Sequence, residues 1–191
     1  MPQADHARFA AALALHWADR PPLPFDSFVR GVADHDRGYG EHDDDSIDGP
    51  MSEEHWLDIQ RRSFTPRGED TVVDLVAALH VRRLIGDRPA GDDAAAIVEE
   101  LCAMSGVTRE DAQAADLVTN VCDVISFELC FEQPSEREVR GYSLVLDGVG
   151  AVTVDPLPFD TPELRGLVTA YELDGYPGRL VPVVVPYRVA P

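Results

Sequence analysis

The sequence predicts an α+β protein in which a mainly α-helical bundle is followed by a small antiparallel β-meander. Apolar residues recur with helical spacing over the first two-thirds of the chain, whereas after Gln133-Pro134 short Val-rich runs alternate with Gly and Pro. We therefore expect a helical core over residues 1–134 and a β-rich extension over residues 135–191 that packs on it. A chain of 191 residues suffices for one domain with a substantial core.

The first two helices are predicted by apolar stripes and by prolines. Residues 4–18 place one histidine and four apolar residues on a single helical stripe, namely His6, Phe9, Ala10, Leu13 and Trp17. Pro21, Pro22 and Pro24 end that helix. A second helix is expected over residues 26–36, and Gly38 suits the C′ position just after it.

Later helices are predicted from their end signals. We expect a loop over residues 37–51 and helices over residues 52–62, 70–85, 92–105 and about 108–131. Ser52 is a suitable N-cap for the first of these. Thr71 and Asp74 resemble a capping box at the second, which should stop at Gly86. Thr108 is expected to open the last.

The C-terminal part is expected to form the antiparallel β-meander over residues 138–189. Its Val-rich segments are short and are separated by Gly or Pro turns. Pro182 and Pro186 interrupt the last segment. Because proline cannot donate a ladder hydrogen bond, we expect this last strand at an edge of the sheet.

The composition excludes some classes of partner. With 35 acidic and 16 basic residues, the formal net charge is −19, which argues against binding nucleic acid or anionic lipid. This negative charge is compatible with a small anionic substrate, because a bound metal makes the local field positive. No apolar run is long enough for a membrane span, and Cys102, Cys122 and Cys130 are expected to be buried thiols in a reducing cytoplasm.

The dipeptide His35-Asp36 is the first candidate for chemistry. An imidazole and a carboxylate together suit a divalent metal such as Fe, Mn, Ni, Zn or Mg. Taken alone the pair is a weak signal, and a capping or solvent-exposed pair has better than even odds.

Three further polar residues favour a metal site that includes His35 and Asp36. His6 and His80 lie on apolar helix faces, and Asp123 lies within the apolar stretch VCDVISF. Each alone is more often a hydrogen-bonded core group than a metal ligand. Four helices that each turn such a group inward favour a common metal site, because buried charges are normally paired or coordinate a metal.

The ordered set also carries a resemblance. It resembles the HD-domain superfamily of metal-dependent phosphohydrolases and, more closely, an uncharacterised bacterial HD-like family, a domain of unknown function. The matching segments span nearly the whole chain and are Gln3-Ala4-Asp5-His6, His35-Asp36-Arg37-Gly38-Tyr39, Leu79-His80, Asp123-Val124-Ile125-Ser126-Phe127 and Pro156-Leu157-Pro158-Phe159. Arg37 and Tyr39 depart from the more usual acidic residue and Trp, which predicts a change in the charge and shape of the pocket.

The resemblance implies a helical HD-like core with a metal held by His6, His35, Asp36 and Asp123. The metal would lower the pKa of a bound water and orient it at an electrophile. Asp36 would thus serve catalysis as well as binding. His80 would be a second-metal ligand, a phosphate donor or a general acid.

The implied function is hydrolysis of a small phosphate ester or nucleotide, and two alternatives stay open. The first is an HD-type di-iron oxygenase, which needs a second metal and more histidines. The second is a non-catalytic metal-binding or structural protein, favoured by Tyr39 standing where many HD phosphohydrolases place a Lys. The sequence also leaves a homodimer open.

The remaining candidates are expected to lie on the surface. His42 and His55 could supply a middle histidine for a second metal, but both are expected in loop or surface positions, as is His16. Arg82 and Arg83 lie one turn from His80 and could contact an anionic substrate, but solvated helix-surface positions are expected for them. The acidic run Asp43-Asp44-Asp45 could shield or gate the pocket, but a solvated loop is expected.

Overall fold

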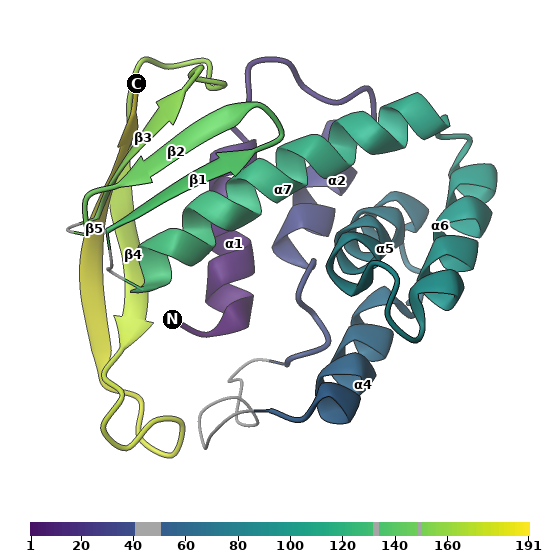
Figure 1. Ribbon diagram of the computed structural model, residues 1–191, viewed down its shortest axis with the longest axis horizontal. Helices are drawn as coiled ribbons and strands as arrows, with labels where there is room; N and C mark the ends of the chain where they lie inside the picture. The colour runs from purple at the N-terminus through teal and green to yellow at the C-terminus, as the bar shows by residue number, and fades with distance from the viewer. Residues whose placement is uncertain (41–50, 132–133, 149) are drawn as a thin grey trace.

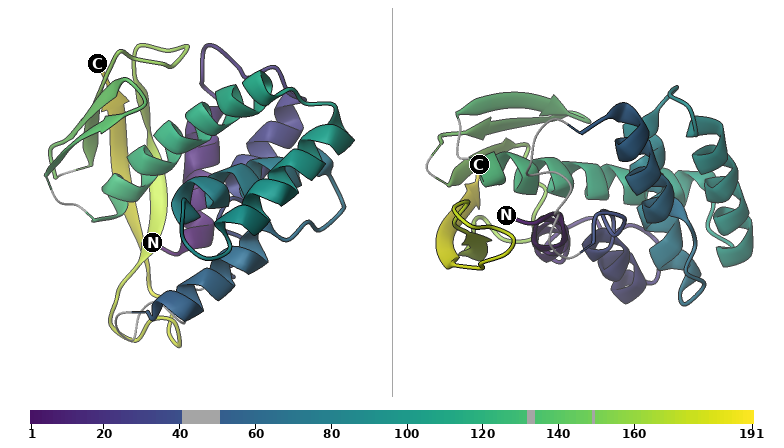
Figure 2. Two further views of the ribbon diagram at one scale, coloured as in Figure 1. Left: turned by 45° about the vertical axis from the view of Figure 1, so that its right-hand side comes forward. Right: turned by 90° about the horizontal axis from the view of Figure 1, so that it is seen from below.

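The computed structural model describes residues 1–40, 51–131, 134–148 and 150–191. Its helices lie beside a mixed sheet, and the long helix α7 (Arg109–Phe131) runs from the sheet to the far end of the helical part (Figure 1). The view from below separates the strands from most of the helices (Figure 2). The predicted α+β class is confirmed. Within the described ranges, no helix has the length and apolar character that crossing a membrane requires.

Helix α1 (Gln3–Ala14) carries the predicted stripe but ends earlier than residue 18. His6, Phe9 and Leu13 are buried, as expected. Trp17 is also buried, but it lies beyond the helix and forms an isolated β-bridge with Phe159. The chain therefore leaves the helix to join the C-terminal part.

Helix α2 (Phe25–Ala33) also ends earlier than predicted, so His35 and Asp36 lie in the turns that follow it. The prediction that Gly38 is its C′ residue is wrong. A Cβ on Gly38 would lie 2.1 Å from the carbonyl oxygen of Ile59, and the Gly38 N–H donates to Ser63 Oγ at 2.9 Å. Gly38 therefore permits close packing against helix α4 (Glu53–Phe64).

The capping of helix α5 (Thr71–Ile85) differs from the prediction. Asp70, not Thr71, is the N-cap, and its carboxylate accepts hydrogen bonds from the backbone N–H groups of Val72 and Val73 at 3.0 and 3.4 Å. The helix stops at Gly86, as predicted.

Other end signals are confirmed. Ser52 caps α4 by accepting from the His55 N–H at 3.2 Å. Thr108 Oγ1 accepts from the Asp111 N–H at 3.1 Å at the start of α7. Between them, helix α6 (Gly91–Ser105) lies where residues 92–105 were predicted to be helical.

The sheet contains strands β1 (Ser135–Val139), β2 (Tyr142–Leu146), β3 (Ala151–Asp155), β4 (Leu164–Tyr171) and β5 (Pro182–Ala190). Their order is β1-β2-β3-β5-β4, and β3 pairs with β5 in parallel. The predicted antiparallel meander is therefore wrong beyond β3. So is the edge position of the last strand, because β5 lies between β3 and β4.

The two prolines of β5 are accommodated by partial pairing. Strand β3 pairs with Arg188, Val189 and Ala190 only, whereas β4 pairs with β5 from Pro182 to Val189. Pro182 and Pro186 therefore lie where β5 has one paired side, so neither has to donate into a second ladder.

One hydrophobic core joins the helices to the sheet. Ala10 of α1, Val118 of α7 and Val154 of β3 are fully or almost fully buried members of the same cluster. A second cluster lies between α4, α5 and α6. The division at residues 134 and 135 stays a prediction.

Candidate metal centre

The five residues singled out from the sequence meet in one buried cluster. His6 comes from α1, His35 and Asp36 from the turn after α2, His80 from α5 and Asp123 from α7. Two groups of three within the cluster, His6 with His35 and Asp36 and His35 with His80 and Asp123, offer ligand atoms within 4.8 Å of one another.

Close packing of α2 on α5 brings His35 and Asp36 beside His80. A Cβ on Gly31 of α2 would lie only 2.6 Å from the Cβ of Val76 on α5. The missing side chain lets the two helices approach closely, and the chain leaves α2 next to the following turn of α5.

The nitrogen and oxygen atoms of the cluster lie at coordination-like separations. His6 Nε2 is 3.0 Å from Asp123 Oδ1 and 3.8 Å from Asp36 Oδ2. His35 Nε2 lies 3.4 Å from Asp36 Oδ2 and 3.5 Å from Asp123 Oδ1, and His80 Nε2 lies 3.3 Å from Asp36 Oδ1. Atoms that share a small cation are separated by about 3 Å, because each lies about 2.0–2.2 Å from it.

Two buried imidazole nitrogens have no hydrogen-bond partner in the described part of the chain. They are His35 Nε2 and His80 Nε2, and the residues are 0% and 2% exposed. Burying a polar atom without a partner costs about 1–3 kcal/mol. A cation between His35 Nε2 and the two carboxylates would satisfy that nitrogen, so the donor set of His6, His35, Asp36 and Asp123 fits a divalent metal.

The outer nitrogens of His6 and His35 are held by neighbouring groups. His35 Nδ1 lies 2.6 Å from the carbonyl oxygen of Val32, to which it donates. His6 Nδ1 lies 2.7 Å from Ser126 Oγ, whose own proton goes to the carbonyl oxygen of Asp123. Donation through Nδ1 would direct the Nε2 lone pair of each ring at a bound metal, as in metal-binding histidines.

His80 has the opposite arrangement. Its Nδ1 lies 2.9 Å from an NH2 nitrogen of Arg83, and a guanidinium can only donate. His80 Nδ1 therefore accepts, and the ring proton of the neutral imidazole sits on Nε2, which faces the cluster. The same Arg83 nitrogen donates to Asp123 Oδ2 at 3.2 Å.

The carboxylates and His35 hold opposite charges. Although burial opposes ionisation, the neighbouring histidines His35 and His80 hold the pKa of Asp36 below its usual range. The pKa of Asp123 is likewise lowered, against burial, by His80, His35 and His6. Burial lowers the pKa of His35, but Asp36 and Asp123 outweigh it and raise the value to about 10. The metal-free cluster thus holds a proton on His35 as its cation.

The cluster opens into a pocket of about 600 Å³. His6, Asp36, His80 and Asp123 contribute to its lining. Apolar walls come from several elements, namely Trp56, Leu84, Val124, Phe127 and Val139. A ligand of small-molecule size could therefore reach the cluster.

The other predicted residues lie elsewhere. His16 is an exposed residue that contacts Asp160 at 3.3 Å, and His55 belongs to neither candidate metal group. His42 and the run Asp43-Asp44-Asp45 lie outside the described residues.

Arg37 does not change the charge of the pocket, contrary to the prediction. It turns away from the pocket, and its guanidinium donates to Asp74 Oδ1 at 2.8 Å and to the carbonyl oxygens of Ser63 and Thr65. Tyr39 does line the pocket, and its hydroxyl lies 3.4 Å from Gln60 Nε2.

Two residues of the site were missed by reasoning from sequence. Arg83 was expected at the solvated surface, yet its side chain is only 16% exposed and contacts both His80 and Asp123. Its spacing of three residues from His80 on one helix was the available signal. Ser126, which contacts His6, could have been found in the same way, because it follows Asp123 by three residues on α7.

The chain belongs to the family described as "Protein of unknown function (DUF3891)", whose model matches residues 1–174. The expectation of an uncharacterised family is thereby confirmed, whereas the residue pattern of that family and membership of the HD superfamily stay predictions. No curated protein and no solved structure matches the chain at a significant level.

Proposed function

We propose that the chain is a metal-dependent phosphohydrolase that acts on a small phosphate ester or nucleotide. The observation that carries this proposal is the convergence of His6, the unpartnered Nε2 of His35 and two buried carboxylates beside an open pocket. The order of these residues along the chain, and its resemblance to the HD pattern, favours phosphoester hydrolysis over other metal chemistry.

His6, His35, Asp36 and Asp123 would hold the ion. Two neutral imidazoles and two carboxylates suit Mn, Fe, Ni or Zn, and Mg less well. A divalent ion supplies Lewis acidity there and lowers the pKa of water to near neutrality. The Nδ1 contacts of His6 with Ser126 and of His35 with Val32 keep both rings oriented for this task.

His80 would act on the substrate instead of serving as a ligand. Because Arg83 occupies the Nδ1 side, the neutral ring of His80 holds its proton on Nε2, on the side of the cluster, and His80 also lines the pocket. A proton at this position can be donated to a phosphoryl oxygen or to the leaving oxygen. Of the roles open to His80, the contact with Arg83 therefore favours the phosphate donor or general acid.

The pocket supports a substrate with an apolar or aromatic body. Trp56 and Phe127 offer ring surfaces, and Arg137 on β1 supplies a cation among the described lining residues. The Arg137 side chain is 58% exposed and is bound to Glu128 at 2.9 Å. It could therefore contact a ligand at the mouth of the pocket, away from the buried cluster. A phosphate at the metal and a second polar group near Arg137 would fit this arrangement.

The alternatives are less well supported. A di-iron oxygenase needs two sets of ligands, but the two candidate groups found in the described ranges share His35. A purely structural metal favours a site closed to ligands. Here four of the five residues line an open pocket.

The test is phosphate release from a panel of phosphate monoesters, diesters and nucleotides by protein loaded with Mn, Fe, Ni, Zn or Mg. We expect turnover of at least one substrate with one of these metals. His80→Gln should lower kcat about 100-fold, as removal of a general acid does, while the metal content is retained. Asp36→Asn should abolish both turnover and metal binding.

His16→Gln is the matched control, because it removes an exposed histidine outside the cluster. Its activity should equal that of the unchanged protein. Metal-replete protein that releases phosphate from no member of the panel would overturn the proposal. Activity that survives in Asp36→Asn would assign the turnover to a contaminant.

A further inference from the structure

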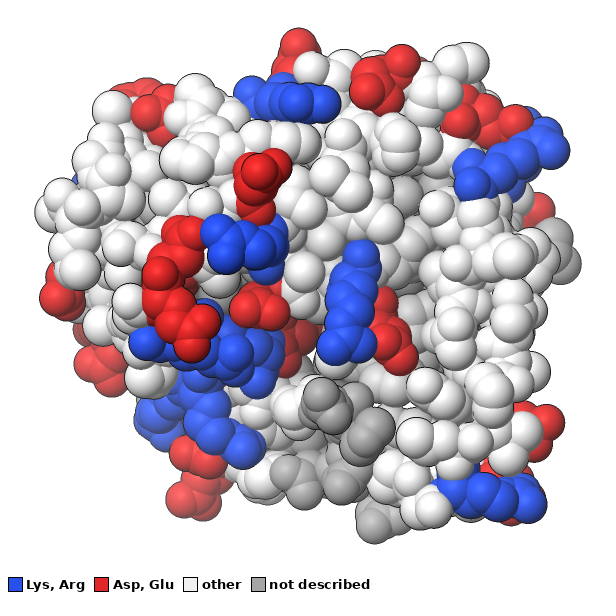
Figure 3. Space-filling model, turned by 180° about the vertical axis from the view of Figure 1, so that it is seen from behind, with Lys and Arg blue, Asp and Glu red and all other residues white. Residues whose placement is uncertain are grey.

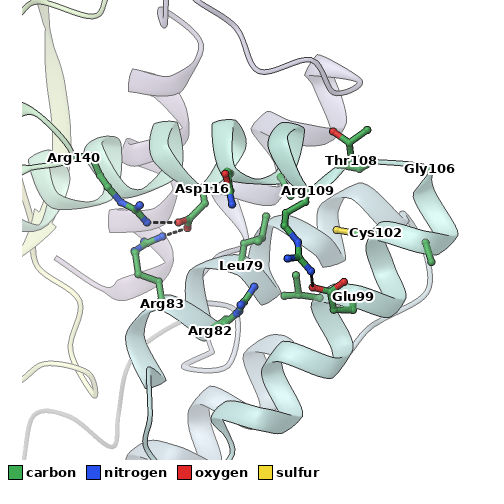
Figure 4. A pocket seen from close by; sticks show the side chains of 15 residues that line it. Leu79, Arg82, Arg83, Glu99, Cys102, Gly106, Thr108, Arg109, Asp116 and Arg140 are labelled. Carbon is green, nitrogen blue, oxygen red and sulfur yellow. Dashed lines mark hydrogen bonds and ion pairs between the residues drawn. The ribbon is translucent and has the colours of Figure 1, made fainter.

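A second and larger pocket lies between α5, α6 and α7. Its volume is about 920 Å³, and none of the five cluster residues lines it. Four arginines do, namely Arg82, Arg83, Arg109 and Arg140. Figure 4 shows Arg82 and Arg109 directed toward the middle of this pocket from α5 and α7, with Arg83 and Arg140 at one side.

Positively charged side chains are scarce in this molecule. The chain has a net charge of −19 and contains no lysine, so its 16 basic residues are all arginines. On the face opposite to that of Figure 1, arginines lie beside acidic side chains (Figure 3). In the pocket, four guanidinium groups face the two carboxylates of Glu99 and Asp116.

The arginines differ in how firmly they are held. Asp116 binds both Arg83 and Arg140, and Arg83 is also bound to Asp123. Among the described residues, the Arg109 side chain bonds only to Glu99, at 2.9 Å, in a pair whose side chains are 72% and 58% exposed. Such exposed pairs contribute at most about 1 kcal/mol and rearrange readily.

Within the described ranges of the chain, Arg82 makes no hydrogen bond or ion pair. Arg82 and Arg109 therefore have donors to spare inside the pocket. Two planar guanidinium forks that converge from different helices match the oxygens of a phosphoryl group. The positive end of α7, which begins at Arg109, adds to the same field.

We propose that this pocket binds a small phosphorylated molecule through Arg82 and Arg109. Leu79, Val98 and Val107 provide apolar wall for an organic body attached to the phosphoryl group. Arg83 forms the partition between this pocket and the metal centre, since it reaches Asp116 on one side and His80 with Asp123 on the other. The site is separate from the metal centre and requires no metal.

The test is calorimetric titration of the chelator-treated protein with inorganic phosphate, followed by glycerol 3-phosphate as an organic phosphate and succinate as a dicarboxylate. We expect saturable binding of both phosphates, with weaker binding of succinate. The double variant Arg82→Gln with Arg109→Gln should weaken phosphate binding at least about tenfold, because two charge-assisted contacts are lost.

The matched control is Arg61→Gln with Arg62→Gln, which removes the same charge from α4 and changes no residue that lines the pocket. It should change the affinity less than about twofold, as expected for exposed charges at a distance. A second variant, Ala103→Glu, places a carboxylate on the exposed α6 side of the pocket and should also weaken phosphate binding. Circular dichroism checks that each variant is folded.

Three outcomes would overturn the proposal. The first is the absence of saturable phosphate binding up to about 10 mM, an affinity too weak for a built site. The second is equal loss in the test and control pairs, which would indicate a general charge effect. Tighter binding of succinate than of either phosphate would assign the pocket to carboxylates instead.

Discussion

Two buried acidic sites in the helical part have similar burial but different partners. Asp74 is 2% exposed, and it is bound by the guanidinium of Arg37 and by the backbone N–H groups of Arg67 and Gly68. Asp36 and Asp123 are 6% and 9% exposed, and most of their close partners are imidazole nitrogens. Two of those nitrogens lack hydrogen bonds.

The difference teaches that burial of a carboxylate does not by itself indicate a metal. The Asp74 site is complete, because a guanidinium and two backbone donors satisfy the charge. The cluster of Asp36 and Asp123 instead combines anionic oxygens with nitrogen lone pairs, and that combination is satisfied by a cation. The predictions below test this contrast, beginning with the largest expected effect.

Arg37→Met should destabilise the protein by about 3–5 kcal/mol, because it leaves Asp74 buried without its counter-charge. Chemical denaturation would measure the loss of unfolding free energy. Arg30→Met is the control, since it breaks the 2.6 Å pair with Asp70 in which Arg30 is 63% exposed, and it should cost less than about 1 kcal/mol. Equal losses would remove the contrast between the two sites.

The metal-free protein should lose stability as the pH rises from about 6.5 to about 10. The folded-state pKa of His35 is raised from 6.5 to about 10, so its contribution is complete below pH 6.5 and is lost as the pH approaches 10. The slope should reach about 1.4 kcal/mol per pH unit. Asp36 and Asp123 act oppositely: their lowered pKa values give stability that is present above about pH 4 and lost in acid.

Unfolding measured across this pH range, with and without saturating metal, checks the prediction. Metal should remove the alkaline loss, because the ion replaces the proton on His35. A pH-independent unfolding free energy of the metal-free protein between pH 6.5 and 10 would contradict it.

Ser126→Ala should weaken metal binding about 10- to 100-fold, because His6 loses the group that orients its ring. Isothermal titration with Zn or Mn would measure the change. Thr119→Val on the same helix is the control, since in the described part of the chain the Thr119 hydroxyl bonds only to the carbonyl oxygen of Ala115. The two variants should differ clearly in metal affinity, and the same affinity in both would exclude an orienting role for Ser126.

Asp70→Ala should cost about 1 kcal/mol through loss of the α5 N-cap, whereas Thr71→Ala should cost little. Thermal denaturation of the two variants provides the comparison. A larger loss for Thr71→Ala would restore the capping box predicted from the sequence.

The helical positions of the cluster could be predicted because burial and periodicity agree. His6, His80 and Asp123 each sit among apolar residues, and all three are buried in the structure. The spacing of Arg83 from His80 indicated a shared helix face, but it did not identify the ion pairs of Arg83, because these depend on Asp116 and Asp123 of another helix. The local sequence pattern also gave the wrong N-cap for α5. Thr71 and Asp74 resemble a capping box, but Asp70 caps the helix.

The sheet shows the same limit. The strands were predicted from short Val-rich runs, but their order was not, because the parallel pairing of β3 with β5 joins residues far apart in sequence. Two prolines in β5 indicated an edge, although only part of that strand lacks a second neighbour.

The central claim is that the cluster binds one divalent metal. The most direct measurement is elemental analysis of protein purified without chelator, alongside the Asp36→Asn variant. We predict about one metal per chain in the unchanged protein and none in the variant, the stoichiometry of a single site. Metal-free protein that also fails to take up Mn, Fe, Ni or Zn on titration would contradict the account, as would equal metal content in the two proteins.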